Sequence, residues 1–207
     1  MKLEIPLSVL RILAPFCSSD DTRESICGIA ITDGCAAATD GYRLLYCESA
    51  RIVARDVPGG AGTALVNVQA LAGLKVRPRD QASVIVRLEG ETAAEMTACL
   101  DCENARTRES LPQVRIGACV TLVEYPDWRR YCLSPIGEAA VSAYTNGRYL
   151  AEFGDAAVRI AAYLGNSGSG MIRIRHGIDG KSPLTVEFDP GNAVLATFAG
   201  VLMPCCP

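Results

Sequence analysis

The chain has 207 residues, of which 49% are apolar, 20 are Lys or Arg and 23 are Asp or Glu, so its formal net charge is −3. This apolar fraction is enough to bury a core, which argues against a disordered chain. The slightly acidic balance argues against a surface that is cationic throughout, as in a protein wholly covered by nucleic acid, although a local basic stripe fits within it.

The cysteines and the N-terminal residues bear on the compartment. Residues 1–16 contain Glu4, Arg11 and two prolines where a secretory leader needs an unbroken apolar segment, and no apolar run approaches the length of a membrane span. We therefore expect a soluble, cytoplasmic protein that has no membrane partner. In that compartment most of the ten cysteines should be reduced and packed as small hydrophobic residues.

One cysteine pair has a spacing that suits metal or thiol chemistry. Cys99 and Cys102 stand three positions apart, but a zinc site would need a second such pair or histidines at ligand spacing. The one histidine, His176, is far away in sequence, and the adjacent Cys205 and Cys206 are a poor replacement. We expect no metal and no cofactor, and we keep a Cys-based metal-binding protein as the least favoured alternative.

The first 62 residues are predicted to form one unit of short elements. An extended stretch, 1–6, leads into a short amphipathic helix, 7–19, in which Leu7, Leu10 and Leu13 recur at helical spacing. Strands separated by Gly, Asp and Ser turn signals follow at 25–34, 35–41, 42–49 and 51–57, and a Gly-rich linker, 58–62, closes the unit.

The rest of the chain repeats this order twice. The second unit has an extended stretch at 63–68, a weak helix at 69–76, paired strands at 83–90 and 91–100, a charged interruption at 101–113 and a last strand at 114–125. The third has an extended stretch at 139–146, a helix at 147–157 and strands at 158–165, 170–177, 184–190 and 194–204. Short helices need a sheet to pack on, so the predicted class is α+β, with short helices packed on one side of antiparallel sheets.

Four motifs in this order resemble one known family. "ATDGYRLLY" (38–46) is similar to a turn and strand in the central domain of the bacterial DNA polymerase III beta subunit, the sliding clamp. "YPDWRRY" (125–131) resembles the end of that domain, "AYTNGRYLAEFGDAA" (143–157) the opening of the last half-domain, and "VLMP" (201–204) the C-terminal tail. The resemblance implies a DNA-clamp-like fold.

The resemblance also implies a compact domain organisation. Residues 1–134 match the central domain, with two strand-helix-strand units, and residues 135–207 match the second half of the last domain. The family's N-terminal domain has no counterpart in the sequence. Because Met1 directly precedes the first predicted strand, we expect a natural compaction of the clamp.

In the family, the matching segments converge on a hydrophobic pocket that captures short linear motifs of polymerases and other DNA-processing partners. Apolar walls, an adaptable Met and a few Arg donors suit such a ligand. Carried over by position, the implied peptide-binding residues are Thr39, Gly41, Tyr42, Arg43, Leu44, Pro126, Arg130, Tyr131, Val201, Leu202, Met203 and Pro204.

Each of these residues also has a plainer interpretation. Arg43 and Arg130 could pair with the nearby Asp40 and Asp127, and exposed pairs of that kind contribute only about 0–1 kcal/mol. Leu44, Val201 and Leu202 could be ordinary core residues, and Gly41 an ordinary turn glycine. Trp128, which stands next to arginines, could be a base-stacking platform, but a single aromatic residue is weak support for one.

Contacts with duplex DNA, if they form, should be electrostatic and independent of base sequence. The cations predicted on or near the three helices are few: Arg11, Lys75, Arg77, Arg79 and Arg148. No Ser, Cys or His stands in a recognisable catalytic constellation, so an enzyme is not expected.

The leading hypothesis is therefore a sliding-clamp-like processivity factor or docking platform. The alternative is a clamp-derived, non-encircling peptide-binding regulator. The unit count predicts a third unit without a partner inside the chain, so we expect a homo-oligomer that buries residues 139–203. A dimer is favoured, and a trimer or a tetrameric ring are the other assemblies that the count allows.

Overall fold

The computed structural model describes residues 1–57, 63–67, 84–91, 97–102, 120–121, 124–132, 143–165, 170–177, 179, 181–189 and 195–204. The predicted linker 58–62, the predicted helix 69–76 and most of the charged stretch 101–113 lie outside these residues. So do Lys75, Arg77 and Arg79.

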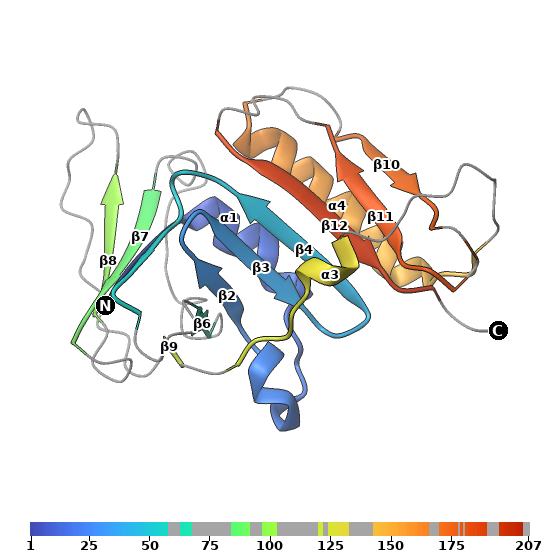
Figure 1. Ribbon diagram of the computed structural model, residues 1–207. Helices are drawn as coiled ribbons and strands as arrows, with labels where there is room; N and C mark the ends of the chain where they lie inside the picture. The colour runs from blue at the N-terminus through green and yellow to red at the C-terminus, as the bar shows by residue number, and fades with distance from the viewer. Residues whose placement is uncertain are drawn as a thin grey trace.

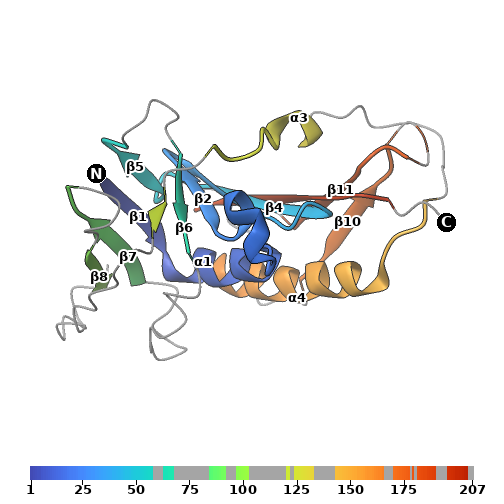
Figure 2. The same ribbon diagram turned by 90° about the horizontal axis from the view of Figure 1, so that it is seen from below.

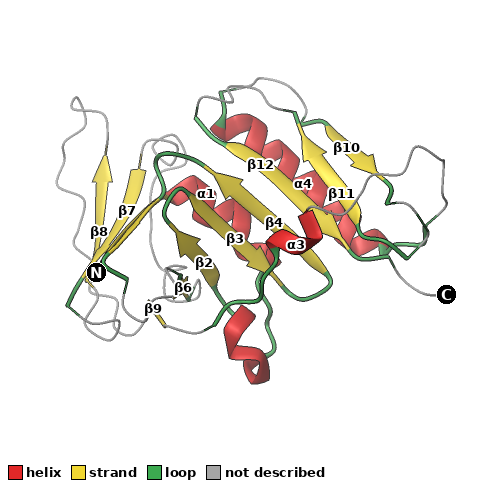
Figure 3. Ribbon diagram, in the orientation of Figure 1, coloured by secondary structure: helices red, strands yellow, loops and turns green. Residues whose placement is uncertain are grey.

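The described residues form short strands and a few helices (Figures 1 and 3). The strands are β1 (Lys2–Pro6), β2 (Ile29–Thr32), β3 (Cys35–Thr39), β4 (Arg43–Glu48), β5 (Val53–Arg55), β6 (Ala64–Val66), β7 (Val84–Glu89), β8 (Thr97–Cys102), β9 (Val120–Thr121), β10 (Ile172–Arg175), β11 (Leu184–Phe188) and β12 (Thr197–Leu202). The helices are α1 (Leu7–Leu13), α3 (Arg129–Cys132) and α4 (Gly147–Tyr163), with 3-10 turns η1 (Ala14–Phe16) and η2 (Asp21–Ile26).

These strands pair in two antiparallel sheets. The larger sheet has the order β10-β11-β12-β4-β3-β2-β6-β9, and the smaller has the order β5-β1-β7-β8. The predicted hairpin of β7 and β8 is present, with Val84 opposite Cys102 and Glu89 opposite Thr97. The predicted α+β class, with antiparallel sheets, is confirmed.

Helices α1 and α4 cover the same face of the larger sheet, while the single turn of α3 lies on the opposite face (Figure 2). Helix α1 buries Leu7, Leu10 and Leu13, as their spacing predicts, and Pro15 follows its end, where a missing N–H breaks the helical hydrogen bonding. The rings of Phe16, from η1, and Phe153, from α4, lie 5.0 Å apart in the main core. The core therefore joins the two helices to each other as well as to the sheet.

Helix α4 is longer than predicted. It has 17 residues and begins at Gly147, after the N-cap residue Asn146, whose side-chain oxygen accepts a hydrogen bond of 3.0 Å from the backbone N–H of Arg148. The prediction of a strand at 158–165 is therefore wrong. The buried residues Phe153, Ala157 and Ile160 continue the helical spacing through this stretch, and its short run of alternating apolar and polar residues was misleading.

The third unit pairs with the first unit inside the chain. Strand β12 runs antiparallel to β4, from Thr197 opposite Glu48 to Leu202 opposite Arg43. The premise that this unit has no partner within the chain is therefore wrong, because β12 extends the sheet of the first unit. No helix in the described part of the chain is long and apolar enough to cross a membrane.

Gly200 of β12 packs tightly against Phe153 of helix α4. A Cβ built on Gly200 would lie 2.5 Å from Cε1 of Phe153 and 2.9 Å from the carbonyl oxygen of Leu44. Either the ring or the strand would have to move to make room for it.

We predict that Gly200→Ala lowers the free energy of unfolding by about 1–3 kcal/mol, the usual effect of overpacking a core. Gly147→Ala is the matched control, because a Cβ on Gly147 meets nothing within 4 Å and alanine favours a helix. Urea unfolding followed by circular dichroism measures both variants. Equal stability of Gly200→Ala and the wild type would contradict the close packing described for this strand.

Candidate functional site

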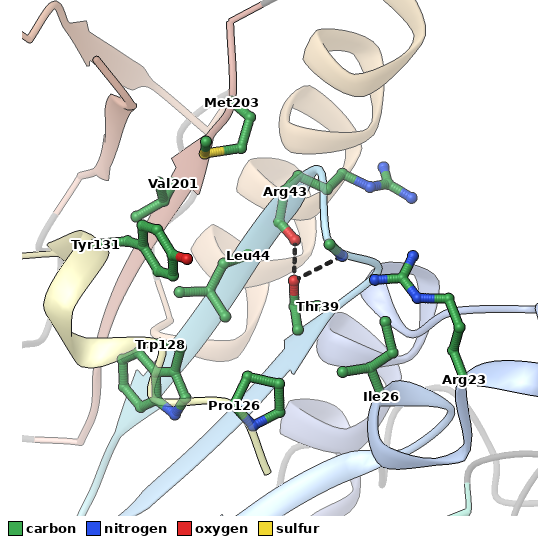
Figure 4. Close-up of a pocket in the computed structure, with 11 residues that line it drawn as sticks. Arg23, Ile26, Thr39, Arg43, Leu44, Pro126, Trp128, Tyr131, Val201 and Met203 are labelled. Atoms are coloured by element: carbon green, nitrogen blue, oxygen red, sulfur yellow. Dashed lines mark hydrogen bonds between the residues drawn. The ribbon is translucent and has the colours of Figure 1, made fainter. Parts of the chain in front are cut away.

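An apolar pocket of about 250 Å³ opens on the face of the larger sheet that carries α3 (Figure 4). Its walls come from β3, β4, β12, η2 and the segment that contains α3. The residues that line it are Arg23, Ile26, Thr39, Gly41, Arg43, Leu44, Pro126, Trp128, Tyr131, Val201 and Met203.

The floor of the pocket is a row of side chains across three neighbouring strands. Thr39 of β3 lies opposite Leu44 of β4, and Leu44 lies opposite Val201 of β12. Residues that pair across antiparallel strands share a face of the sheet, so these three side chains stand next to one another. Their neighbours along the strands, such as Leu45 and Leu202, point into the main core instead.

Segment 124–132 forms a second wall, and Trp128 holds it on the sheet. The indole is only 8% exposed, its ring lies 4.9 Å from that of Tyr46, and the guanidinium of Arg129 stacks on it at 4.6 Å. The backbone N–H of Tyr131 donates to the carbonyl of Trp128 at 3.0 Å, which closes the single turn of α3. Trp128 is therefore an anchor of this wall, and its burial argues against a base-stacking platform.

The turn between β3 and β4 is fixed by two polar side chains. Thr39 Oγ1 donates to the carbonyl of Arg43 at 2.7 Å and accepts from the N–H of Gly41 at 3.0 Å. Asp40 Oδ1 accepts from the N–H groups of Tyr42 and Arg43 at 2.9 and 3.0 Å. Gly41 has a φ of +91°, a conformation that glycine adopts without steric cost. The turn is thus held in one shape at the rim of the pocket.

The guanidinium of Arg43 points away from the pocket and is buried beneath this turn (Figure 4). The side chain is 6% exposed, and it pairs with Asp40 at 3.0 Å and with Glu152 of α4. It also donates to the carbonyl of Pro15 at 2.8 Å. Arg43 therefore makes the ion pair with Asp40 that the sequence analysis kept as an alternative, and it joins the turn to α4 and to the end of α1.

Aromatic rings complete the surroundings of Arg43. Its guanidinium lies 4.8 Å from the ring centroids of both Phe16 and Tyr149. Tyr149 in turn stacks on Tyr42, with ring centroids 6.2 Å apart. The charge is thus enclosed by two carboxylates, one carbonyl and two rings, which suits a planar, permanently charged group.

The structure brings most of the predicted peptide-binding residues together. Thr39, Gly41, Arg43, Leu44, Pro126, Tyr131, Val201 and Met203 all line the pocket. Leu202 does not, because the alternation along β12 turns it into the main core, where it is fully buried. Tyr42 is exposed beside a separate polar groove, and Arg130 stacks on the ring of Tyr131 at 4.7 Å. Pro204 follows Met203 and lies outside the lining.

Sequence reasoning missed Arg23 and Ile26 in the lining of the pocket, and it assigned Trp128 no place there. Both missed residues belong to η2, and the predicted strand 25–34 wrongly included Ile26, which is the last residue of this 3-10 turn. Burial of Ile26 beside Leu44 and Thr39 depends on how η2 folds back over the sheet (Figure 4). Trp128 carried a signal, because a large aromatic residue within "YPDWRRY" is a common anchor.

The helical face carries few of the predicted DNA contacts. Arg11 and Arg148 are the two that the structure describes, and Arg148, although 83% exposed, pairs with Glu152 at 3.1 Å. Arg159 is a further cation on helix α4, which the sequence analysis did not count because it assigned residues 158–165 to a strand. Its Nη1 donates to the carbonyl of Arg11 at 3.4 Å. Asp155 stands on the same helix, so the described part of this face is only weakly cationic.

Five cysteines are free thiols: Cys17, Cys27, Cys35, Cys47 and Cys132. Burial raises the pKa of Cys35 and of Cys132 to about 11, so both are protonated at neutral pH and are poor nucleophiles. Cys99 and Cys102 both lie in β8. Among the residues that the structure describes, no group of three or more His, Cys, Asp or Glu side chains could hold a metal ion.

The fold is similar to that of solved DNA clamps. Comparison with protein-family models finds no match, and no curated protein matches the sequence. Solved structures of bacterial DNA polymerase III beta subunits do match. The sliding clamp of Bartonella birtlesii, solved with griselimycin bound, is 14% identical, with a TM-score of 0.59, and the match covers 100% of this chain and 66% of that one.

Two further clamps give the same result. The beta subunit of Pseudomonas aeruginosa is 15% identical with a TM-score of 0.58, and the match covers 100% of this chain and 67% of that one. The clamp of Bacillus subtilis is 14% identical with a TM-score of 0.56, and the match covers 100% of this chain and 64% of that one. The protein therefore has the fold of a compact sliding clamp, and it spans about two thirds of the length of these structures.

We predict that Arg43→Met lowers the free energy of unfolding by about 2–4 kcal/mol, because it leaves Asp40 without its cation and Glu152 with only the exposed Arg148. Arg173→Met is the matched control. That side chain is 71% exposed and its pair with Glu187 is long, at 3.9 Å, so its loss should change stability by less than about 0.5 kcal/mol. Chemical unfolding of both variants tests this, and equal losses would contradict the structural role given to Arg43.

Proposed function

We propose that the protein is a docking platform of the sliding-clamp type, without chemistry of its own, whose apolar pocket binds short linear motifs of polymerases or other DNA-processing partners. One observation carries the proposal. Three segments far apart in sequence, 39–44, 126–131 and 201–203, build a single apolar pocket around the row Thr39, Leu44 and Val201. The clamp fold supports the same conclusion.

The chemistry of the pocket suits an apolar side chain of a peptide. Leu44, Val201 and Ile26 offer aliphatic surface, while Trp128 and Tyr131 offer aromatic surface. Met203 lines the pocket near Val201, and its flexible thioether adapts to different side chains (Figure 4). The backbone N–H of Met203 donates to the carbonyl of Tyr42 at 2.8 Å, so the residue that directly follows β12 is held to the turn. The site is therefore largely preformed.

We predict that a synthetic peptide of the type Gln-x-x-Leu-Phe binds with a Kd in the micromolar range, about −8 kcal/mol. Met203→Ala should weaken binding by about tenfold, because it removes the thioether that would pack on the partner's apolar anchor, and loss of such a contact can cost more than 1 kcal/mol. Leu44→Ala should weaken it as well. Isothermal titration calorimetry measures both effects.

Met171→Ala is the control for this experiment, since Met171 is 66% exposed and lies outside the pocket. It should bind the peptide as the wild type does. If the wild-type protein shows no binding at millimolar peptide, the pocket has no such function.

We further propose that the protein works as a homo-oligomer. The edge strand β10 argues against one way of joining two copies. If β10 paired with itself about a two-fold axis, with Ile172 and Ile174 kept on the core face, Arg173 would lie opposite Arg173 or Arg175 of the other copy. Directly opposed like charges destabilise a sheet. We infer that another surface joins the copies.

If the protein is a homo-oligomer, light scattering should give a mass above that of one chain at tens of micromolar protein. Encirclement of DNA by chains of this length needs more than one copy, because each copy spans about two thirds of a clamp chain. A monomer at that concentration would instead favour the second candidate, a peptide-binding regulator that does not encircle DNA. Association with DNA in either case should weaken steeply as salt rises.

A further inference from the structure

Large apolar side chains are exposed on the third unit, where α4 lies behind strands β10 to β12 (Figure 1). In the part of the chain that the structure describes, four large hydrophobic side chains are exposed, and three of them belong to this unit: Tyr144, Val158 and Met171, at 70, 55 and 66%. A Cβ built on Gly170 would lie 2.6 Å from the backbone nitrogen of Val158. The chain thus packs against α4 just before β10 and brings Met171 next to Val158. Adjacent exposed hydrophobic residues commonly mark an interaction surface.

The flank of α4 that carries Val158 has no charged side chain. Leu150, Ala151 and Gly154 share this flank with Val158, because residues at this spacing lie on one side of a helix. The charged side chains of the helix stand at other positions, of which Asp155 borders the flank: Arg148, Glu152, Asp155 and Arg159. DNA and charged peptides are attracted by opposite charge, which the uncharged flank does not offer. A partner surface without charge therefore fits it better.

The uncharged flank carries a projecting side chain and a gap next to each other. A Cβ built on Gly154 meets nothing within 4 Å, so a side chain from another molecule can reach the helix backbone at this position. Val158 projects from the helix one turn later. A two-fold axis between these two positions would place Val158 of each copy at Gly154 of the other, as when ridges of one helix pack into grooves of its neighbour. The flank is therefore complementary to itself.

We propose that two copies of the chain join through the uncharged flank of α4, with their helices antiparallel about a two-fold axis and Met171 at the edge of the contact. The inference rests on the homo-oligomer of the proposed function, and it names the surface that joins the copies. This contact needs no pairing between edge strands, so it avoids the opposition of Arg173 and Arg175 that pairing of β10 with itself would create. Contact between uncharged flanks brings no like charges together on the flanks themselves.

Two variants of the full chain test this contact by analytical ultracentrifugation, which measures the Kd of self-association. The wild type should form pairs of chains at tens of micromolar protein. Val158→Lys should raise the Kd at least about tenfold, because it brings two like charges together in the interface. Gly154→Ala should also raise the Kd, because its methyl group fills the gap. Within one chain the same methyl group meets nothing and alanine favours the helix, so this variant should unfold no more easily than the wild type.

Thr197→Lys is the matched control, because it adds the same charge at an exposed position of β12. By the alternation along this strand, Thr197 lies on the same face of the sheet as Val201, opposite the helices. It should associate as the wild type does. If Val158→Lys or Gly154→Ala keeps the wild-type Kd, or if Thr197→Lys weakens association as much, the surface is refuted while the homo-oligomer stands. If the wild type is a monomer at tens of micromolar, the homo-oligomer fails as well, and the peptide pocket is unaffected.

Discussion

The buried charge of Arg43 is the constraint on which the site depends. A guanidinium removed from water needs its charge matched and its N–H groups bonded, and Arg43 finds these partners on three different elements: Asp40 in the turn, Pro15 after α1 and Glu152 in α4. Each of those elements must therefore be in place before the charge is satisfied. Because Arg43 also begins β4, the same residue that requires this convergence sets the position of Leu44 in the pocket floor.

The larger sheet carries apolar side chains on both of its faces. Along β4, Leu45 and Cys47 enter the main core under the helices, whereas Leu44 and Tyr46 enter a smaller cluster under Trp128. The second cluster covers only part of the outer face, because segment 124–132 is short. The pocket is the portion of that face which the segment leaves open, between Trp128 and the turn at Gly41. Its position follows because successive side chains of each strand point to opposite faces of the sheet and both faces carry apolar residues.

The sequence predicts the local features of this structure well and its long-range features less well. The turn at 39–43 was predictable because Asp40 and Gly41 have specific backbone preferences, and α1 because its leucines recur at helical spacing. The end of α4 was not, since Val158 to Ala162 fit a strand as easily as a helix when read alone. The pairing of β12 with β4 joins residues far apart in the chain, and no local pattern encodes it. Arg43 had two interpretations; its ion pair with Asp40 is local, but its burial against Glu152 of α4 depends on a long-range contact that no local pattern encodes.

The pocket floor contains residues from both ends of the chain. Leu44 lies in β4 of the first unit, and Val201 lies opposite it in β12 of the third unit. A ligand seated there contacts both strands, and it leaves if they part. Ligand binding would therefore stabilise the pairing of β4 with β12. Above the Kd, this stabilisation grows with the logarithm of the free ligand concentration. If a partner peptide binds there as proposed, occupancy of the pocket and pairing of β4 with β12 are coupled equilibria, and a higher partner concentration would hold the C-terminal strands more firmly to the first unit.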